Sequence, residues 1–595
     1  MKLERLILLV FVGLTVFAGL TRWQTLSEKP LIMTDGQGYY AYLPAFFIYH
    51  DPQFNFVDEI NERYYPEDKR ARFVVPTDSG NVNKYFVGTA VVQAPFFLAA
   101  CVVTWFTEHP TDGYSAPFQL FVGLAALFYL LFGSFFLLRV LEELGYGKGV
   151  VASVLLLLVF ATNLLFYTLY EPSMSHVYSF FTVSAFFYFG RRTLVEASTR
   201  AVLAAALFLG LTVLIRPING LILLGLPMVS GGFTGMLNGI ELLFQRKKVL
   251  LIGVLAVIAI VSIQPLVYLL QTGKPFVWSY QEEGFNFLSP ELYNVLFSYR
   301  KGLFVYCPVL IIAVLGTIAG AFRRKPGLVE GGFFLGLISW VIASWWMWYY
   351  GGSYGHRAFI EFYPFFGIGL AYALSKGVGF LGPKLLIVSI PLWIALQMVQ
   401  TYQYVNHILP FDNMSKEKYW NLFLRTGDDL RWYYSGYPGE DSYRAIDSLL
   451  LQHNMEQVLG WGNEDQFVSE HPHSGVSTAK MEAHHQYGIT LRKNVVELPE
   501  GINTVRVSTW VRPSSRKTDL SLVCAIEDSL GQSYFWRSYP LRPQFDGVNQ
   551  WSWVTALFKC GVPRSPTDRF VVYPMRSDGS VLYVDDFEVS FIKAQ

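Results

Sequence analysis

The sequence predicts a polytopic α-helical membrane protein that carries an all-β domain at its C-terminal end. Of its 595 residues, 52% are hydrophobic, 17% are aromatic and only 15% are charged, whereas a soluble domain carries about 25% charged residues. Long apolar runs recur up to residue 405, and from about residue 466 apolar and polar residues alternate. The net charge of +1 argues against nucleic acid as a partner.

The first apolar run begins at the N-terminus, which reads MKLERLILLVFVGLTVFAGL. No small-x-small cleavage site follows it, so we expect a retained transmembrane helix over 5–21 rather than a signal peptide. Further runs are long enough to span a bilayer. They lie near 117–138, 149–168, 177–190, 249–270, 303–321, 331–350 and 384–404, with shorter candidates at 201–215, 217–229 and 363–375. The pair 201–229 reads as a hairpin that turns at Arg216-Pro217.

The basic loops predict the orientation, because short cytoplasmic loops are enriched in Lys and Arg. The number of membrane crossings depends on the apolar segment 86–107. If it lies at the surface instead of crossing, every basic cluster falls in the cytoplasm, including those at 191–192, 246–248 and 323–325. This model has about eleven crossings, with the N-terminus inside and the C-terminal domain outside. We therefore expect an integral protein of a bacterial plasma (inner) membrane that contacts membrane lipids.

Residues 31–50, LIMTDGQGYYAYLPAFFIYH, form the most distinctive stretch of the chain. Tyrosines and apolar residues at helical spacing predict a helix that lies at the membrane surface, with Asp35 at its start. Two interpretations of Asp35 remain open. It either caps the helix, as Asp often does, or takes a proton from a polar acceptor beside a lipid-borne donor.

Further polar residues fall in the predicted outer loops, and a one-sided cluster of this kind is a functional hypothesis. Arg216 and Arg357 are expected either to bind phosphate through paired hydrogen bonds or to reach lipid headgroups. Glu361, four residues after Arg357, is expected to be its ion-pair partner. The candidate substrate-binding residues are Tyr39, Lys84, Tyr85, Glu171, His176, Arg216, His356 and Arg357.

The C-terminal part divides into a helical connector over 406–465 and a β-sandwich domain over 466–595. Period-two runs such as INTVRVSTWV, DLSLVCAIED and VLYVDDFEVSF predict about eight antiparallel strands in a jelly-roll-like fold. The Asp585-Asp586 pair either holds a structural calcium or lies at a solvated strand edge. Cys524 and Cys560 either pair or stay as buried thiols.

These motifs resemble those of the GT-C superfamily of polytopic glycosyltransferases, of the protein O-mannosyltransferase and aminoarabinose transferase type. The resemblance covers about residues 1–405, which we take as the transmembrane catalytic domain. It rests on the first-loop acid Asp35, the Lys84-Tyr85-x-x-Gly88 segment and the Arg216-Pro217 hairpin. It implies a polyprenyl-phosphate-linked sugar donor, a glycan, lipid or protein acceptor, and a first-loop acid that is the base or a metal ligand.

Two further points concern this resemblance. Many members carry two adjacent acids in the first loop, whereas Gly36-Gln37 follow Asp35 here. This departure favours a single-base mechanism, so no cofactor is expected and a divalent metal is not favoured. The ending LYVDDFEVSF is similar to the last strand of galactose-binding-like carbohydrate-binding jelly rolls, which implies that the sandwich could bind sugar.

Two other classes of function compete with a glycosyltransferase. One is a transporter or flippase of lipid-linked glycans, and the other is a glycan-binding membrane scaffold. Transporters tend to show internal repeats and polar sites near the bilayer midplane. We see no clear repeat, and the ionisable residues gather at one interface, so the sequence favours the enzyme with Asp35 as its base.

Overall fold

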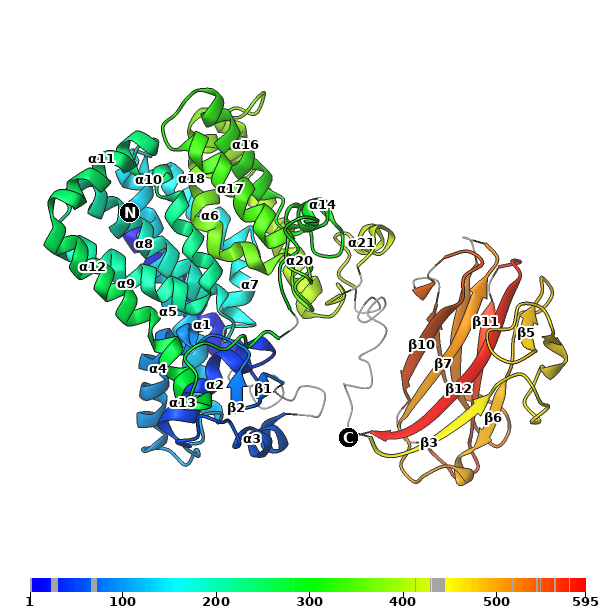
Figure 1. Cartoon of the computed structure of the whole chain (residues 1–595). Coiled ribbons are helices and arrows are strands. Elements are labelled where there is room, and N and C mark those ends of the chain that lie inside the picture. The colour runs from blue at the N-terminus through cyan, green and yellow to red at the C-terminus, as the bar shows by residue number, and fades with distance from the viewer. Residues whose placement is uncertain are drawn as a thin grey trace. The chain divides into compact units, whose positions relative to one another are not determined.

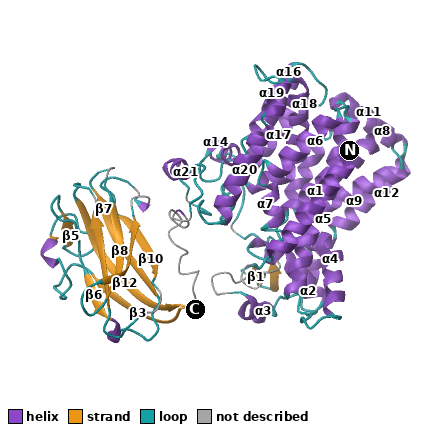
Figure 2. Cartoon of the chain, turned by 180° about the vertical axis from the view of Figure 1, so that it is seen from behind, coloured by secondary structure: helices purple, strands orange, loops and turns teal. Residues whose placement is uncertain are grey.

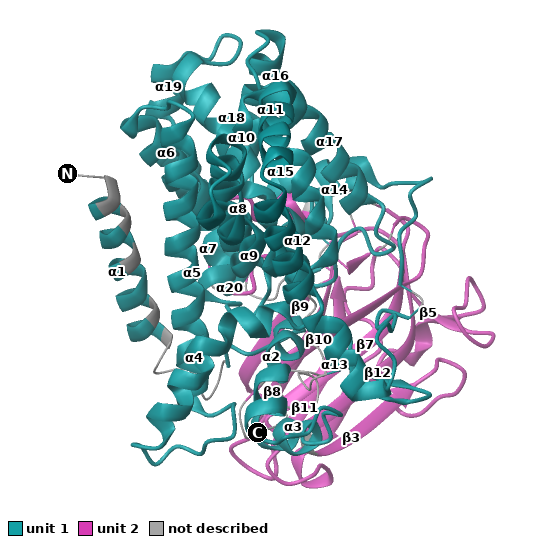
Figure 3. Ribbon diagram, turned by 60° about the vertical axis from the view of Figure 1, so that its left-hand side comes forward, with its two compact units in different colours: residues 1–405, 411–416 teal, residues 406–410, 417–595 magenta. Residues whose placement is uncertain are grey.

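The computed structural model (Figure 1) describes residues 3–22, 30–65, 72–281, 283–412, 414–427, 430, 445–515, 518–541, 544–545, 547–560, 563–576 and 578–594. Helices build the first part of the chain and strands the last, as Figure 2 shows. The chain divides into two compact units (Figure 3). One comprises Met1–Val405 with Phe411–Lys416, and the other Asn406–Pro410 with Glu417–Gln595.

The first unit is a helical bundle with one small β-hairpin. Its first half contains α1 Leu3–Arg22, α2 Asp35–Phe47, α3 Val57–Tyr64, β1 Val74–Thr77, β2 Gly80–Asn83, α4 Gly88–Thr104, α5 Ala116–Glu143, α6 Lys148–Phe160, α7 Leu164–Leu169, α8 His176–Glu196 and α9 Thr199–Ile215. Its second half contains η3 Pro217–Gly225, α10 Pro227–Ser230, α11 Gly232–Gln245, α12 Lys247–Val261, α13 Ile263–Thr272, α14 Leu292–Phe297, α15 Leu303–Tyr306, α16 Val309–Phe322, α17 Leu328–Ala343, η4 Arg357–Phe362, α18 Tyr363–Lys376, α19 Pro383–Val388 and α20 Ile390–Val405.

Four helical segments of the described residues are long and apolar enough to cross a membrane, or five if a pair bent by 106° counts as one span. They are Ala116–Glu143, Lys247–Thr272, Arg357–Lys376 and Pro383–Val405, and the bent pair joins Pro217–Ser230 to Gly232–Gln245. Several other predicted spans form apolar helices shorter than the ~20 residues of a straight crossing. The predicted count of about eleven crossings is therefore not confirmed.

The helix α2 packs inside the first unit, so its apolar and aromatic side chains contact protein, and its place at the membrane surface stays a prediction. Its residues from Gly36 to Ala45 are buried. Tyr40 packs edge-on against Phe97 and Tyr114, and Tyr42 packs against Phe54. An aromatic pattern of this kind fits a membrane surface and a protein core equally well, and here Phe54, Phe97 and Tyr114 supply the core contacts.

The turn predicted at Arg216-Pro217 is present. The helix α9 ends at Ile215, and the backbone of Arg216 is extended before a 3₁₀-helix begins at Pro217. Proline has no backbone N–H and restricts the residue before it to extended conformations, so the helix stops here. The stop leaves the Arg216 side chain at the end of α9 instead of on its face.

The second unit contains α21 Lys416–Leu422, which begins in the last residue of the first unit, and an antiparallel β-sandwich. The strands are β3 Ala445–His453, β4 Phe467–Val468, β5 Thr478–Met481, β6 Leu491–Asn494, β7 Thr504–Pro513, β8 Leu520–Glu527, β9 Ser533–Pro540, β10 Ser552–Lys559, β11 Arg569–Arg576 and β12 Leu582–Ala594. One sheet has the order β10-β7-β12-β5-β4, with β3 on β12, and the other has the order β6-β11-β8-β9.

The sandwich begins earlier than the predicted residue 466. The strand β3 pairs with β12 from Ala445 to His453, within the predicted helical connector. Its LLL run does not alternate, which explains why periodicity missed it. The connector residues 431–444 lie outside the described residues.

Burial and bonding bear on two alternatives left open for the sandwich. Asp585 is fully buried and accepts hydrogen bonds from the backbone N–H groups of His473 and Ser474, at 2.8 and 3.3 Å. Asp585 therefore does not lie at a solvated strand edge, whereas the Asp586 side chain keeps 26% of its surface exposed, and calcium binding by the pair stays a prediction. Cys524 and Cys560 are free thiols.

Candidate active site

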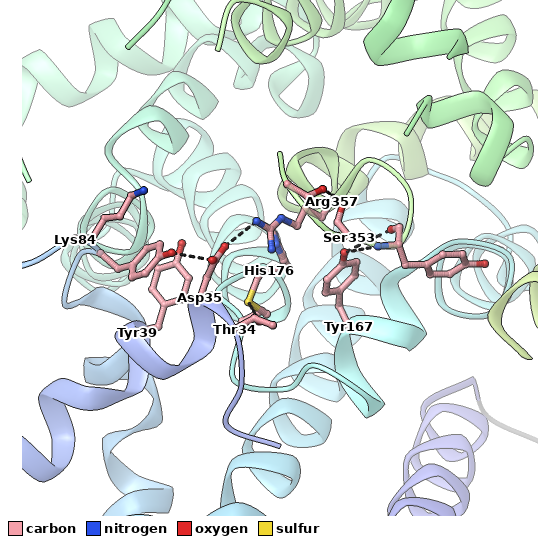
Figure 4. A network of polar contacts seen from close by, with 12 residues as sticks. Thr34, Asp35, Tyr39, Lys84, Tyr167, His176, Ser353 and Arg357 are labelled. Atoms are coloured by element: carbon pink, nitrogen blue, oxygen red, sulfur yellow. Dashed lines mark hydrogen bonds and ion pairs between the residues drawn. The ribbon is translucent and has the colours of Figure 1, made fainter. Parts of the chain in front are cut away.

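Asp35 is the first residue of α2, and its carboxylate lies in a network of polar side chains (Figure 4). The Tyr85 hydroxyl donates to Asp35 Oδ1, and Arg357 Nη2 donates to Asp35 Oδ2, each at 2.7 Å. The N-cap position belongs to Thr34, which makes no side-chain capping bond. The Asp35 side chain keeps 29% of its surface exposed.

The glycines of the TDGQG segment bring Tyr85 to Asp35. A Cβ on Gly38 would stand 2.3 Å from the Tyr85 ring. The Gly38 carbonyl accepts from Asn83 Nδ2 at 2.8 Å, and Asn83 Oδ1 accepts from the Tyr85 backbone N–H at 3.0 Å. Asn83 thus holds the segment 83–85 against the first turn of α2. Only glycine at position 38 leaves room for the Tyr85 ring.

A second charged cluster lies next to the first. Glu361 Oε1 lies 3.1 Å from His176 Nδ1 and 3.2 Å from Arg216 Nη1. Arg216 Nη2 also donates to the Tyr39 hydroxyl at 3.1 Å, and the Tyr39 ring lies 4.6 Å from that of Tyr85. The structure therefore brings the predicted residues Tyr39, His176 and Arg216 together with Asp35, Tyr85 and Arg357.

The predicted pairing of Glu361 with Arg357 is wrong. Residues Arg357–Phe362 form a 3₁₀-helix, in which residues three apart lie on one face. Residues four apart therefore point in different directions, whereas they share a face in an α-helix. Arg357 turns to Asp35, and Glu361 turns to His176 and Arg216.

The loop that carries Arg357 is fixed by residues that the sequence did not suggest. Lys301 is buried, and its ammonium donates to the backbone carbonyls of Ser353 and Phe411. The Tyr354 N–H donates to the Tyr167 hydroxyl at 3.1 Å. A basic residue beside Gly302 gave no sequence signal of this role, because its partners are backbone atoms far along the chain.

Two predicted substrate contacts have other partners. Lys84 forms an ion pair with Glu283 at 2.6 Å, and its ammonium lies 5.5 Å from the centre of the Tyr280 ring. His356 Nε2 lies 3.0 Å from the Trp348 carbonyl oxygen. Both residues are adjacent in sequence to a residue that binds Asp35, and both stabilise the loops around it.

The electrostatic surroundings hold Asp35 ionised. Burial raises the pKa of Asp35, but the Arg357 guanidinium, the Tyr85 hydroxyl and Arg216 outweigh burial and keep the pKa below its ordinary value. Glu171 differs. Burial raises its pKa to about 7, and Arg357 offsets this only in part. One site thus contains a charged acid and an acid that titrates near neutrality.

We expect Glu171 to make stability depend on pH. Because the folded-state pKa of about 7 exceeds the unfolded value of 4.5, its contribution is complete below the unfolded value and is lost as the pH rises through the folded one. The difference in melting temperature between wild type and Glu171→Gln should therefore fall between about pH 5 and about pH 8. Thermal unfolding in detergent measures it. Glu62→Gln, on the exposed side of α3, is the control, and an equal difference at both pH values would contradict the expectation.

Six buried polar atoms of this region have no hydrogen-bond partner within the described protein. They are Glu171 Oε2, Ser175 Oγ, His176 Nε2, His356 Nδ1, Arg357 Nε and Glu361 Oε2. Buried polar atoms in folded proteins are almost always satisfied, by protein, water or ligand. Their concentration in and beside the two charged clusters marks this region as the place where polar ligand atoms or ordered waters belong.

The donor set does not fit a divalent metal ion. No group of three or more His, Cys, Asp or Glu side chains suited to a metal occurs among the residues that the structure describes. Both oxygens of Asp35 already accept hydrogen bonds, and Glu361 contacts an arginine. Two guanidinium groups beside these acids repel a cation, so the site suits an anion better.

Searches against protein-family models and against curated proteins find no match. Among solved structures, the arabinosyltransferase EmbB from Mycobacterium smegmatis matches 98% of this chain and 64% of its own, with 10% identity and a TM-score of 0.41. The CBM22-1 xylan-binding domain of Paenibacillus barcinonensis Xyn10C matches 26% of this chain and 99% of its own, with 17% identity and a TM-score of 0.19. TmCBM61, in complex with β-1,4-galactotriose, matches 26% of this chain and 96% of its own, with 11% identity and a TM-score of 0.15.

Proposed function

We propose that this chain is a membrane glycosyltransferase that moves a sugar from a polyprenyl-phosphate donor to an acceptor on the extracytoplasmic side. The observation that carries the proposal is that a partly exposed carboxylate, Asp35, and two arginine side chains, Arg357 and Arg216, lie in one site. That site belongs to a unit whose helices are long and apolar enough for a membrane. A base, a cationic clamp and access from lipid are the three requirements of this reaction.

The residues support a single displacement. The acceptor hydroxyl gives its proton to an Asp35 oxygen, and its oxygen forms a bond to the anomeric carbon of the sugar. The bond from that carbon to the phosphate oxygen breaks, and the phosphate leaves with the electron pair. Arg357 and Arg216 stabilise the charge that builds on it, because a guanidinium binds two phosphate oxygens at once.

The ion pair between Asp35 and Arg357 links donor binding to base strength. In the free protein Arg357 keeps the pKa of Asp35 low, so the carboxylate is a weak base. When Arg357 turns toward a donor phosphate, Asp35 loses its largest opposing charge and its pKa rises. The acid then becomes a competent base only when the donor is present.

The test is sugar transfer from labelled polyprenyl-phosphate sugars by the purified full chain in lipid nanodiscs, with a panel of donors and with and without a chelator. We expect sugar to be released from the donor only when the protein is present, and we expect this release to persist when the chelator is added. Absence of release over the whole panel would contradict the proposal, and release that the chelator abolishes would overturn the metal-free site.

We propose that the sandwich is accessory to the chemistry, which a truncation tests. A chain that ends at residue 444 lacks both β3 and β12. It should transfer sugar to a small soluble acceptor at the wild-type rate. A chain that ends at residue 465 keeps β3 but removes the strand that pairs with it, so it should aggregate through an unpaired edge. Size-exclusion chromatography and the transfer assay measure both. Loss of all activity in the first chain, with its helices folded, would contradict an accessory role.

A further inference from the structure

Two residues beyond α20, Phe411 and Asp412, pack with the helical unit, although the residues just before them belong to the second unit. We call this pair the strap. Arg300 donates from Nε and Nη2 to the two carboxylate oxygens of Asp412, at 2.7 and 2.8 Å. The Lys301 ammonium donates to the Phe411 carbonyl. Two neighbouring cations thus hold the strap against the segment between α14 and α15, and paired bonds of this kind fix orientation as well as distance.

The strap also supports the loop that ends just before η4. We call residues 349–356, Tyr-Tyr-Gly-Gly-Ser-Tyr-Gly-His, the glycine loop. The Ser353 N–H donates to the Phe411 carbonyl at 3.3 Å, and the Lys301 ammonium donates to the Ser353 carbonyl. A Cβ on Gly352 would stand 3.0 Å from the Phe411 ring, so the glycine lets this ring lie on the loop. Contacts of three different kinds therefore join the strap to the glycine loop.

Fixed contacts continue from Ser353 to the active site (Figure 4). All residues from Ser353 to Arg357 are buried. The Tyr354 N–H donates to the Tyr167 hydroxyl at 3.1 Å, and Arg357 Nη2 donates to Asp35 at 2.7 Å. Close-packed interiors transmit strain instead of absorbing it. A displacement of Ser353 is therefore expected to reach Arg357.

We propose that the strap positions Arg357, so that residues from the stretch leading to the second unit take part in donor binding. This inference rests on the proposed function, in which Arg357 binds the donor phosphate. A guanidinium makes two bonds to phosphate only when its plane is correctly oriented, and a site whose supporting contacts loosen loses affinity. Arg300, Lys301 and Asp412 are then positioning residues, because they act through Arg357. A chain that ends at residue 444 keeps the strap, in line with the activity expected of it.

Hydrogen–deuterium exchange of the full protein in lipid nanodiscs, resolved to single residues by fragmentation, tests this coupling without turnover. Asp412→Asn keeps the size of the side chain and removes the charge that Arg300 binds. We expect faster exchange at Ser353, whose N–H bonds the strap, and also at Tyr354 and Phe359 farther along the chain. Asp412→Glu keeps the charge and should restore slow exchange. Faster exchange at Ser353 alone would make the strap a local contact and overturn the proposal.

The control for the exchange experiment is Glu143→Gln in α5. The Glu143 side chain is 24% exposed, against 21% for Asp412, and it pairs with Arg191 and Arg192. This variant should leave exchange of the glycine loop unchanged. Arg300→Gln breaks the pair of the strap from the other side, so it provides the test if Asp412→Asn does not fold. Equal exchange in wild type and in a folded strap variant would overturn the proposal.

Donor kinetics separate positioning from a general loss of structure. Asp412→Asn should raise the KM for a polyprenyl-phosphate donor about tenfold, the scale of one charge-assisted hydrogen bond. The KM for the acceptor should stay unchanged, and Asp412→Glu should restore the donor KM. A fall in kcat with both KM values as in wild type would indicate less active protein and would overturn the proposal. Absence of transfer by wild type would instead count against the proposed function, and the exchange result would still decide the role of the strap.

Discussion

Asp35→Asn is expected to lower the rate of sugar transfer by about 10²–10⁴-fold, the range that general base catalysis supplies. Asparagine keeps the size of the side chain and one acceptor oxygen, so the hydrogen bond from Tyr85 can persist. It cannot take a proton from the acceptor. We therefore expect the KM for the donor to change little while kcat falls, as measured by single-turnover release from a labelled donor.

The control for this substitution is Asp58→Asn, which changes an exposed acid of α3. It should retain the wild-type rate. A wild-type rate in Asp35→Asn would eliminate the single-base mechanism, and Glu171 would then become the first residue to replace, because its pKa lies near 7. Binding of a labelled polyprenyl-phosphate donor should persist in Asp35→Asn and so show that the donor site is intact.

Arg357→Lys is expected to lower kcat/KM for the donor by about a hundredfold. Lysine keeps the charge but presents a single ammonium, whereas the arginine reaches Asp35 through Nη2 and has a free Nε beside it. The loss of a paired contact to phosphate acts on both binding and the leaving group. Initial rates over a range of donor concentrations measure it, and Arg63→Lys on α3, exposed by half, is the control.

A neutral substitution at the same position separates catalysis from stability. Arg357→Gln removes the cation that contacts the Asp35 carboxylate, so the melting temperature of the variant should fall, because a partly buried charge that loses its nearest partner is costly. The double substitution with Asp35→Asn should recover most of that loss. If the single and double variants melt at the same temperature, the ion pair does not stabilise the fold, and the role of Arg357 in the resting site has to be revised.

The sequence predicted well those helices and strands whose residues form a recognisable pattern within a short stretch of the chain. The strands from β7 to β12 follow from period-two alternation, and the stop at Arg216 follows from the proline after it. The choice of most candidate site residues also follows from a local fact, namely that charged side chains stand out in apolar surroundings. These residues could be named before their contacts were known.

The contacts themselves could not be predicted, because they join residues far apart or depend on helix type. Lys84 and Glu283 are separated by 199 positions, and no periodicity relates them. The two backbone carbonyls that hold Lys301 leave no trace in side-chain chemistry. The aromatic pattern of α2 suggested a membrane surface, and only the packing of Tyr40 and Tyr42 shows that it faces a core.

The 3₁₀ turn at Arg357–Phe362 makes the charge pairing of the site sensitive to backbone winding. It continues directly into α18, which begins at Tyr363. If this turn rewound as α-helix, Arg357 and Glu361 would come to one face, a turn apart. Such a rewinding would pair Arg357 with Glu361 and take Arg357 away from both Asp35 and a donor phosphate. The 3₁₀ winding therefore keeps Arg357 directed at Asp35, and Glu361 directed at His176 and Arg216.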